Sequence, residues 1–265
     1  MKDKKIAIIG CGNLGLSIVN GLISKNTIPL TNITVTKRNI NSLGHLQEKG
    51  VKVSTDNAKA IKESDIIIVA LKPYNILEVL KELNPHFNPE KHILVSLATG
   101  ISLDQIQNTV NCQVPIFRAM PNTAADVGAS LTCISSHSNN TEIINSVRLC
   151  FDSIGTSIFI DENLMDSATV LGACGIAFAL RFIRGMIQGG IQIGFDAKTA
   201  NEIVTHTVNG AAELLIQKNQ HPEFEIDKVT TPKGCTIAGL NEMEHNGFSS
   251  ALIKGIITSF EQIEK

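Results

Sequence analysis

Three glycines near the start of the chain have the spacing of a dinucleotide-binding turn. Gly10, Gly12 and Gly15 follow the apolar run 6–9, and apolar residues then recur at helical spacing as far as Ile23. In such a turn the first glycine bends the chain, the second lets the backbone approach a pyrophosphate, and the third lets helix and strand pack closely. Free N–H groups at the helix start would hold the pyrophosphate. The alternative is an ordinary turn between a strand and a helix.

The residues after the second predicted strand indicate which nicotinamide cofactor fits. An acidic residue about 20 positions past the glycines bonds the ribose 2′-OH of NAD, whereas basic residues accommodate the 2′-phosphate of NADP. Residues 35–39 include Lys37 and Arg38 and contain no acid. The sequence therefore favours NADP(H), with NAD(H) as the alternative cofactor if both side chains are merely solvated charges.

A second segment, residues 229–236, has residue types suited to binding an anion. Pro232 and Gly234 interrupt regular structure, and apolar residues at helical spacing follow them. Free N–H groups at Gly234, Cys235 and Thr236 would form a nest for a carboxylate. Simple capping of the following helix by the threonine hydroxyls explains the same residue types equally well.

Strand-like and helix-like stretches alternate in the first part of the chain and position these segments. The predicted strands cover residues 6–9, 32–36, 65–70, 92–97, 115–119, 130–134 and 157–160. Such alternation gives a parallel, doubly wound sheet that binds ligands at the carboxyl ends of its strands. From residue 162 onward helical spacing dominates. We expect an α/β fold, with a Rossmann domain over residues 1–161 and an all-helical domain over residues 162–265.

Composition excludes several classes of protein. The chain has 265 residues, 43% of them hydrophobic and 18% charged, which is ordinary for a soluble globular enzyme. A net charge of −2 and the lack of a basic cluster argue against a nucleic-acid partner. The first residues lack the apolar segment of a secretory signal. The apolar stretch 168–180 is too short to span a membrane, which needs about 20 residues, so we expect a buried helix.

Cysteine and histidine usage gives no sign of a metal or a disulfide framework. The six cysteines are scattered without a C-x-x-C pair, and the seven histidines lack the spacing of metal ligands. We therefore predict no metal site. Unpaired cysteines fit a reducing, cytoplasmic environment.

Several segments taken together resemble the pyrroline-5-carboxylate reductase family. Residues 10–15 stand where that family has its glycine fingerprint, and residues 70–73 (A-L-K-P) correspond to its A-V-K-P segment. Residues 118–123 reproduce the family's R-A-M-P-N-T unaltered, and residues 229–244 match V-T-S-P-G-G-T-T-x-x-G-L-x-x-L-E with changes. Glu162, Asp166 and Thr169 also look like the family. The matches run in family order over nearly the whole chain.

The resemblance implies NAD(P)H-dependent reduction of 1-pyrroline-5-carboxylate to L-proline, the last step of proline biosynthesis. It implies a Rossmann domain followed by a helical dimerisation domain, with homodimers that can assemble further into decamers, and no membrane or nucleic-acid partner. By residue matching, the pyrophosphate is assigned to Gly10, Gly12, Asn13 and Leu14. Asn57 is assigned to the adenosine, and the approach to the nicotinamide is assigned to Ala70, Lys72, Pro73, Ala98 and Asn122.

The chemistry implied by this resemblance depends on positioning. A protonated cyclic imine accepts a hydride without a covalent intermediate, so no nucleophile is required and orientation supplies much of the rate. The loop amides would hold the substrate carboxylate, Thr231 would support the loop, and Thr236 would hydrogen-bond the ring nitrogen or the carboxylate. A reactive Cys235 thiol is the alternative to a small polar loop residue. A general acid at Lys72 is the alternative to a residue that shapes the cofactor loop.

Some positions depart from the family pattern. Lys233 replaces the first loop glycine, Cys235 replaces a threonine, and Ile176 replaces a proline. These departures leave another imine or a β-hydroxyacid open as the substrate of an NADP-dependent reductase. A protein that senses NADP without turnover is an alternative of a different class.

Overall fold

The computed structural model describes residues 3–26 and 28–263. Residues 1–2 begin the predicted Rossmann domain and the segment tested for a secretory signal, and residues 264–265 end the predicted helical domain. These four residues lie outside the described residues. The chain divides into two compact units, one running to Ile176 with a segment from Phe260 onward, the other covering Ala177–Ser259. The domain boundary predicted between residues 161 and 162 stays a prediction.

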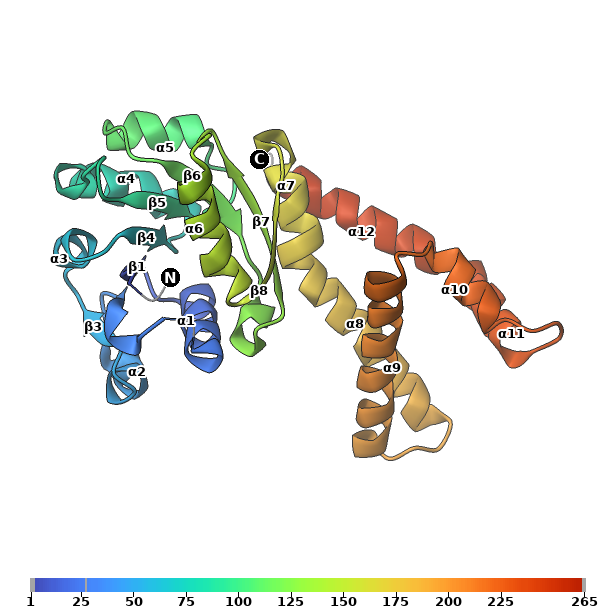
Figure 1. The fold of residues 1–265 in the computed structure, drawn as a ribbon. Helices are drawn as coiled ribbons and strands as arrows, with labels where there is room; N and C mark the ends of the chain where they lie inside the picture. Colours follow the sequence, from blue (N-terminus) through green and yellow to red (C-terminus); the bar gives the residue numbers. More distant parts are fainter. Residues whose placement is uncertain (1–2, 27, 264–265) are drawn as a thin grey trace. The chain divides into compact units, whose positions relative to one another are not determined.

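The first unit is built on one sheet, in which the described residues form eight strands (Figure 1). The strands are β1 (Ile6–Ile9), β2 (Ile33–Thr36), β3 (Lys52–Ser54), β4 (Ile66–Val69), β5 (Ile93–Ser96), β6 (Ile116–Met120), β7 (Ser130–Ser136) and β8 (Gly155–Phe159). Their order is β3-β2-β1-β4-β5-β6-β7-β8. The predicted doubly wound sheet is confirmed, and its strand order reverses between β1 and β4, where such sheets bind ligands.

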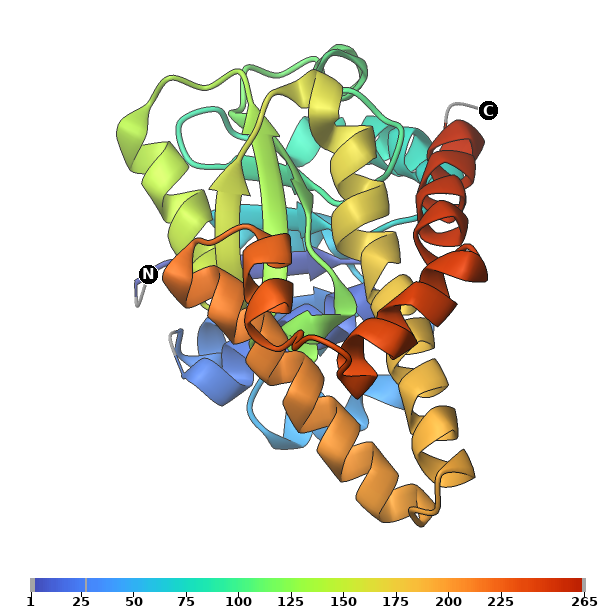
Figure 2. The same ribbon diagram turned by 90° about the vertical axis from the view of Figure 1, so that its right-hand side faces the viewer.

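Helices cover both faces of the sheet, which explains the continuous apolar runs of the central strands. One face carries α1 (Asn13–Lys25), α2 (Gly44–Glu48) and α6 (Thr141–Asp152); the other carries α3 (Asn57–Lys62), α4 (Pro73–Leu83) and α5 (Leu103–Val110). Ile6 and Ile8 of β1 point into the first core, and Ala7 and Ile9 point into the second. Each fully buried isoleucine side chain contributes roughly 1.5–3 kcal/mol. Figure 2 shows α6 beside strands β7 and β8.

Two features of the sheet differ from the prediction. β7 runs antiparallel to β6, because residues 121–129 form only the short 3-10 helix η4 (Thr123–Val127) and its flanks. A parallel crossover needs about a dozen or more residues. The edge strand β3 was not predicted, because its side chains are only partly apolar and partly buried. The sheet is therefore mostly parallel, with one antiparallel pair.

The segment between the sheet and the long helices changes its helical type several times. The 3-10 turn η5 (Glu162–Leu164) leads into α7 (Met165–Ala168), then a π-helical turn η6 (Thr169–Cys174), then α8 (Gly175–Gln192). The predicted burial of the helix at 168–180 is wrong within this chain, since Leu171 and Leu180 are 65% and 58% exposed. Its predicted length is also too short: residues 162–192 are long and apolar enough to cross a membrane by length and composition, which is weak evidence taken alone.

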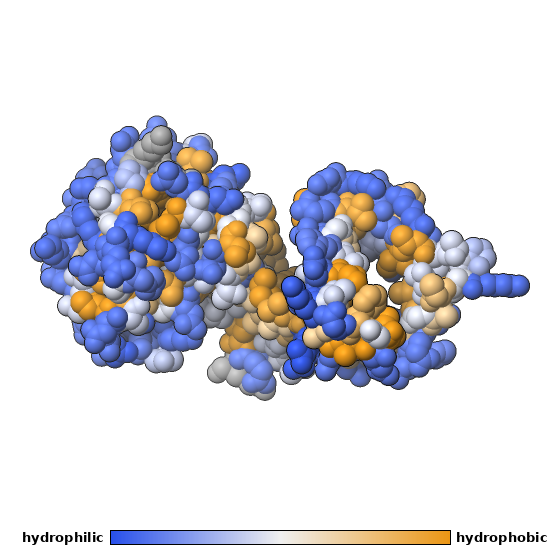
Figure 3. Space-filling view, turned by 90° about the horizontal axis from the view of Figure 1, so that it is seen from below, coloured by the Kyte–Doolittle hydropathy of each residue, from blue (hydrophilic) through white to orange (hydrophobic). Residues whose placement is uncertain are grey.

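The second unit is helical over residues 177–259. It contains the rest of α8, then α9 (Ala197–Lys218), α10 (Pro222–Lys228), α11 (Cys235–His245) and most of α12 (Phe248–Ile263). Asp196 caps α9 by accepting from the N–H groups of Lys198 and Thr199. Within this range only Ala200 and Val204 are buried. Large apolar side chains therefore remain uncovered, and Figure 3 shows them gathered on the surface of this unit.

Candidate functional site

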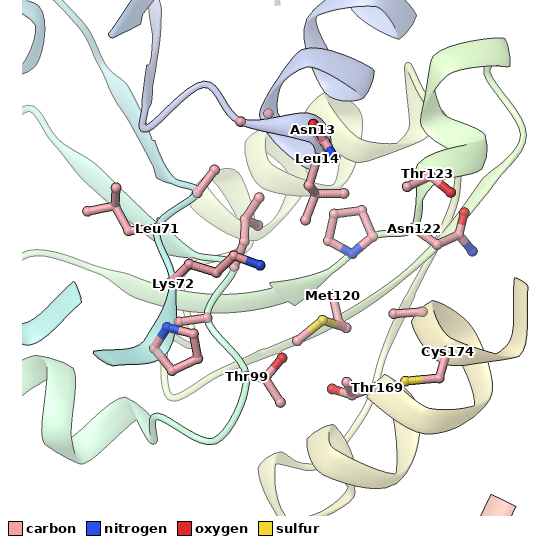
Figure 4. A pocket seen from close by; sticks show the side chains of 18 residues that line it. Asn13, Leu14, Leu71, Lys72, Thr99, Met120, Asn122, Thr123, Thr169 and Cys174 are labelled. Carbon is pink, nitrogen blue, oxygen red and sulfur yellow. The ribbon is translucent and has the colours of Figure 1, made fainter. Parts of the chain in front are cut away.

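The carboxyl ends of β1, β4, β5 and β6, together with η6, border one cavity of about 660 Å³ in the first unit (Figure 4). It is lined by Gly12, Asn13, Leu14, Gly15, Ala70, Leu71, Lys72, Pro73, Leu97, Ala98, Thr99, Met120, Pro121, Asn122, Thr123, Thr169, Ala173 and Cys174. This edge, beside the switch point between β1 and β4, is where doubly wound sheets bind their ligands. The cavity is therefore the candidate cofactor site.

The glycines between β1 and α1 shape one wall of this cavity. Gly10 has a φ of 86°, and a Cβ there would collide with the side chain of Leu71. A Cβ on Gly15 would lie 3.6 Å from Cβ of Ala70, so α1 packs closely on the sheet. A Cβ on Gly12 would have only the carbonyl O of Gly10 nearby, at 4.0 Å. Gly12 thus leaves room for a ligand to reach the backbone.

The first turn of α1 presents backbone donors to the cavity. No side chain among the described residues caps this helix, and its first turn contains no acid. The N–H groups of Gly10 and Cys11 bond the carbonyl O of Thr36 at 3.1 and 2.8 Å, and that of Gly12 bonds Gly10 at 2.7 Å. The N–H groups of residues 13–15 have no acceptor one turn earlier in the helix. They form the anion-binding end of α1.

Lys37 and Arg38 lie outside the lining of the cavity, directly after β2. Because β2 pairs in parallel with β1, both residues stand at the same sheet edge as the glycine turn. Nζ of Lys37 donates to Oγ of Ser42 at 3.0 Å, and Arg38 is exposed. Burial raises the pKa of Cys11 to about 11 against a smaller opposite effect of the Lys37 charge, so this thiol is neutral.

The segments after β4 and β5 form the next part of the wall. Lys72 is extended (φ −67°, ψ 147°), as is usual before proline, and Pro73 is the first residue of α4. The N–H of Ala70 donates to the carbonyl O of Ile9 at 2.8 Å, which fixes this segment beside β1. Figure 4 shows Lys72 and Thr99 at the cavity. The general-acid and loop-shaping roles of Lys72 both stay predictions.

Asn122 follows β6 and joins two neighbouring turns. It is 6% exposed; its Oδ1 accepts from the N–H of Ala124 at 3.0 Å, and its Nδ2 donates to the carbonyl O of Gly172 in η6 at 3.0 Å. Its backbone N–H donates to Oγ of Ser130 at 3.0 Å. One N–H and one lone pair of the side-chain amide are then left for a ligand.

Arg118, near the end of β6, anchors the chain where the helical segment begins. It is buried, with Nη1 3.3 Å from Oε1 of Glu162 and Nη2 3.4 Å from Oδ1 of Asp166. Oε1 of Glu162 also accepts from the N–H of Leu103 at 2.6 Å, and Nε2 of His137 lies 3.5 Å from its Oε2. Loss of one partner would leave a buried charge unpaired, so these contacts fix the start of that segment.

Most of the residues assigned to the cofactor from the sequence lie around this cavity. Those in its lining are Gly12, Asn13, Leu14, Ala70, Lys72, Pro73, Ala98 and Asn122. Gly10 shapes the turn from behind, Lys37 and Arg38 follow β2, and Asn57 is the first residue of α3, after its cap Asp56. The assignment of all twelve residues to a cofactor stays a prediction.

Sequence reasoning missed part of the lining. The residues not assigned beforehand are Gly15, Leu71, Leu97, Thr99, Met120, Pro121, Thr123, Thr169, Ala173 and Cys174. Several of them stand inside the segments that carry the family resemblance, so the signal was present for Leu71, Met120 and Pro121. Leu97 and Thr99 required the end of β5 to be located in space.

The segment predicted to bind the substrate belongs to the second unit. α11 begins at Cys235 with Gly234 as its N-cap, and no side chain among the described residues caps it. The N–H of Gly234 donates to the carbonyl O of Thr231 at 2.9 Å, so the prediction that this N–H is free is wrong. The hydroxyl of Thr230 donates to the carbonyl O of Ile226 at the end of α10 instead of capping α11. This leaves the N–H groups of Cys235 and Thr236 as the donors of the predicted nest.

Gly234 is required by its surroundings. A Cβ there would lie 2.6 Å from Oγ1 and 3.0 Å from the carbonyl O of Thr231. Lys233 has a φ of 60°, the left-handed region that favours glycine. The loop therefore holds a strained, charged residue directly before an uncapped helix start.

The residues of the first unit fit a dinucleotide. The cavity combines uncapped helix donors, a position without Cβ at Gly12, and two basic residues at the same edge of the sheet. Pyrophosphate and 2′-phosphate groups require donors of these two kinds. Fold and cavity together define a two-unit nicotinamide-dependent oxidoreductase, with the dinucleotide site in the sheet unit and a separate helical unit.

Comparison with known proteins narrows this class. Residues 5–100 match the family model of NADP oxidoreductases, coenzyme F420-dependent, and residues 162–265 match the model of pyrroline-5-carboxylate reductase dimerisation. Pyrroline-5-carboxylate reductase 2 of Dictyostelium discoideum is 38% identical, over 99% of this chain and 93% of that protein. Reductase 1 of the same organism is 43% identical over 98% of this chain, which spans only 49% of that longer relative. The reductase of Methanosarcina acetivorans is 34% identical, over 99% of this chain and 97% of that protein.

Solved structures agree with these sequence matches. The Plasmodium falciparum pyrroline carboxylate reductase, crystallised with NADP bound, has a TM-score of 0.90 and 25% identity, and the alignment covers 99% of this chain and 98% of that one. The Streptococcus pyogenes 1-pyrroline-5-carboxylate reductase has a TM-score of 0.85 and 28% identity, and the alignment covers 98% of both chains. The chain belongs to the pyrroline-5-carboxylate reductase family.

Proposed function

We propose that this protein reduces 1-pyrroline-5-carboxylate to L-proline with NADPH. The observation that carries the proposal is the cavity at the switch point, where the uncapped start of α1, the Lys72 segment and Asn122 converge. Membership of the reductase family and the NADP bound in the Plasmodium relative support it. NADPH is the preferred cofactor in this proposal because Lys37 and Arg38 follow β2 where NAD-binding folds carry an acid.

The chain's own residues bind and orient the reactants. The N–H groups of residues 13–15 hold the pyrophosphate, and Arg38 holds the 2′-phosphate. NADPH, when bound, supplies the hydride for the imine carbon. The N–H groups of Cys235 and Thr236 hold the substrate carboxylate. The oxygen of the Thr236 hydroxyl accepts from the ring N–H and so favours the protonated imine. Thr231 supports the loop, because its carbonyl O accepts from the N–H of Gly234.

We also propose how the protein assembles and where it works. The segment that matches the dimerisation model carries the uncovered apolar side chains of α8 and α9, so we expect homodimers formed through this surface and decamers built from them. This explanation accounts for the apolar run 162–192 without a membrane. All six cysteines are free thiols, which fits a reducing cytoplasm. No nucleic-acid partner is expected at a net charge of −2.

The direct test measures NADPH oxidation with 1-pyrroline-5-carboxylate, other cyclic imines and β-hydroxyacids in wild-type protein and in Thr236→Ala. Removing this positioned hydroxyl should lower kcat/KM for pyrroline-5-carboxylate by roughly 10- to 1000-fold while NADPH still binds. Thr205→Ala is the matched control, since that threonine lies on α9 and its hydroxyl bonds backbone carbonyls of its own helix. Wild-type turnover in Thr236→Ala would remove Thr236 from the site.

The substrate panel also decides among the other functions. Faster reduction of another imine or a β-hydroxyacid would replace the proposed substrate. Tight NADPH binding without turnover of any compound would indicate a sensor of NADP rather than an enzyme.

A further inference from the structure

The π-helical turn η6 forms part of the cavity wall and is held by residues outside it. Thr169, Ala173 and Cys174 of η6 line the cavity, opposite the start of α1. π turns are rare in proteins and occur mostly at functional sites. Two of the four residues 172–175 are glycines, which have low helix propensity, so this sequence does little to fix the local helix type. The geometry of this wall must therefore be set from outside.

Two side chains provide that support, one within β6 and one just after its end. Arg118 fixes the chain before η6 through its ion pairs with Glu162 and Asp166. Asn122 fixes η6 itself, because its Nδ2 donates to the carbonyl O of Gly172. Glu162, Asp166 and Gly172 are thereby tied to the strand whose end also lines the cavity.

Asn122 is in turn held rigidly. Its Oδ1 caps η4 by accepting from Ala124, and its backbone N–H donates to Ser130 at the start of β7. At 6% exposure this side chain has little freedom to rotate. A fixed amide that donates to a backbone carbonyl can define the position of the turn carrying that carbonyl.

We propose that Asn122 is a positioning residue that clamps the π turn Thr169–Cys174 and so sets the wall of the cavity facing the reacting end of the cofactor. The inference rests on the proposed function in one respect, namely that the cavity holds NADPH. In this role Asn122 acts through Gly172, and the residues it places are Thr169, Ala173 and Cys174. A displacement of this wall misaligns the reactants while the pyrophosphate donors of α1 stay in place.

The test uses Asn122→Ser in the full-length protein. Serine is a strong N-cap residue, so it keeps the contact with Ala124, but it is too short to reach Gly172. We expect kcat to fall by about 10- to 100-fold, as for a small misplacement of reactants. The dissociation constant of NADPH should rise by a smaller factor than kcat falls, because the pyrophosphate donors at the start of α1 are unchanged. Asn122→Asp keeps the oxygen that accepts from Ala124 and removes the Nδ2 donor to Gly172, so it should give the same results as Asn122→Ser.

A second readout reports on η6 without any substrate. Cys174 is half-buried in the cavity, and its alkylation by N-ethylmaleimide can be followed peptide by peptide with mass spectrometry. NADPH should slow this alkylation in wild-type protein. In both Asn122 variants the rate without NADPH should rise about three- to tenfold, as expected for the loss of one neutral hydrogen bond. This readout remains informative even if pyrroline-5-carboxylate proves not to be the substrate.

Asn20→Ala is the matched control for a merely structural effect. Nδ2 of Asn20 donates to Oδ1 of Asp126 in η4 at 2.6 Å, so this variant removes a side-chain amide hydrogen bond near Asn122 but leaves the bond to η6 in place. It should lower the melting temperature and leave both kcat and Cys174 alkylation unchanged. Wild-type alkylation and kcat within twofold in Asn122→Ser, or equal losses in Asn20→Ala, would overturn the proposal.

Discussion

Arg38 and Lys37 are the side chains on which cofactor choice depends at the scale of single residues. Arg38→Ala should raise the KM for NADPH by about 10- to 100-fold, since a hydrogen bond to a charged group contributes about 1.5–3 kcal/mol. The KM for NADH should not change, because NADH lacks the 2′-phosphate. Steady-state kinetics with both cofactors measure this. Lys81→Ala, an exposed lysine at the end of α4, controls for the lost charge. An equal rise for both cofactors would contradict the assignment.

His92 gives a residue-scale prediction about stability. It is buried; its Nδ1 accepts from the N–H of Asn88 at 3.0 Å, and no partner for Nε2 is found among the described residues. Burial, and to a smaller degree the charge of Lys91, lowers its pKa below the ordinary value. The ordinary pKa of histidine is about 6.5. At a pH below this value, His92 of the unfolded chain binds a proton that His92 of the folded protein does not. The free energy of unfolding must therefore fall as the pH falls below about 6.5, until the folded-state pKa is reached.

The variant His92→Asn isolates this contribution. Its side-chain oxygen can accept from Asn88 in place of Nδ1, and it does not titrate. Urea unfolding should be measured between about pH 7.5 and 5. As the pH falls, the free energy of unfolding should decrease more steeply for wild-type protein than for His92→Asn, by at most about 1.4 kcal/mol per pH unit for one proton. Parallel pH profiles for the two proteins would show that His92 is not the titrating group.

At the scale of elements, the sequence predicted the strands and turns whose structure depends on neighbouring residues in the chain. The central strands were found because their apolar runs are buried on both faces, and the glycine turn was found because its spacing is a backbone requirement. The direction of β7 depends on the length of the chain that precedes it, and β3 is held by its pairing with β2 more than by its own residues. The π turn η6 depends on Asn122, which is about fifty residues away in sequence, and periodicity cannot show such a contact.

The loop before α11 carries an element-scale prediction. Lys233 has a φ of 60°, which costs a residue with a Cβ roughly 1–2 kcal/mol relative to glycine. Lys233→Gly should therefore raise the free energy of unfolding by up to about 1 kcal/mol, after allowing for the greater freedom of glycine in the unfolded chain. Chemical denaturation measures the change. Lys233→Ala removes the same charge without relieving the strain and should not stabilise; equal stabilisation by both would point to charge as the cause.

At the scale of the whole molecule, the two units bury their apolar residues very differently. The sheet unit has two cores of its own, whereas residues 177–259 bury only Ala200 and Val204. The sequence predicted a helical region there because helical spacing is local, but it predicted a buried helix at 168–180 that this chain does not bury. Large apolar side chains exposed together on helices need cover from another chain or from lipid. The match to a dimerisation domain favours another chain.

Leu180→Glu tests that choice on the intact protein. Leu180 is exposed on α8 within the chain, so in a monomer the change should alter stability by no more than about 0.5 kcal/mol. If a second copy covers this face, the buried charge should shift wild-type dimers or larger assemblies towards monomers in light scattering and abolish the dependence of the melting temperature on protein concentration. Gln47→Glu adds the same charge on α2 of the sheet unit and should change neither. The opposite result is a wild-type protein that is monomeric and floats with lipid vesicles, together with a Leu180→Glu variant that does not float. It would show that lipid, and not a second copy, covers this surface.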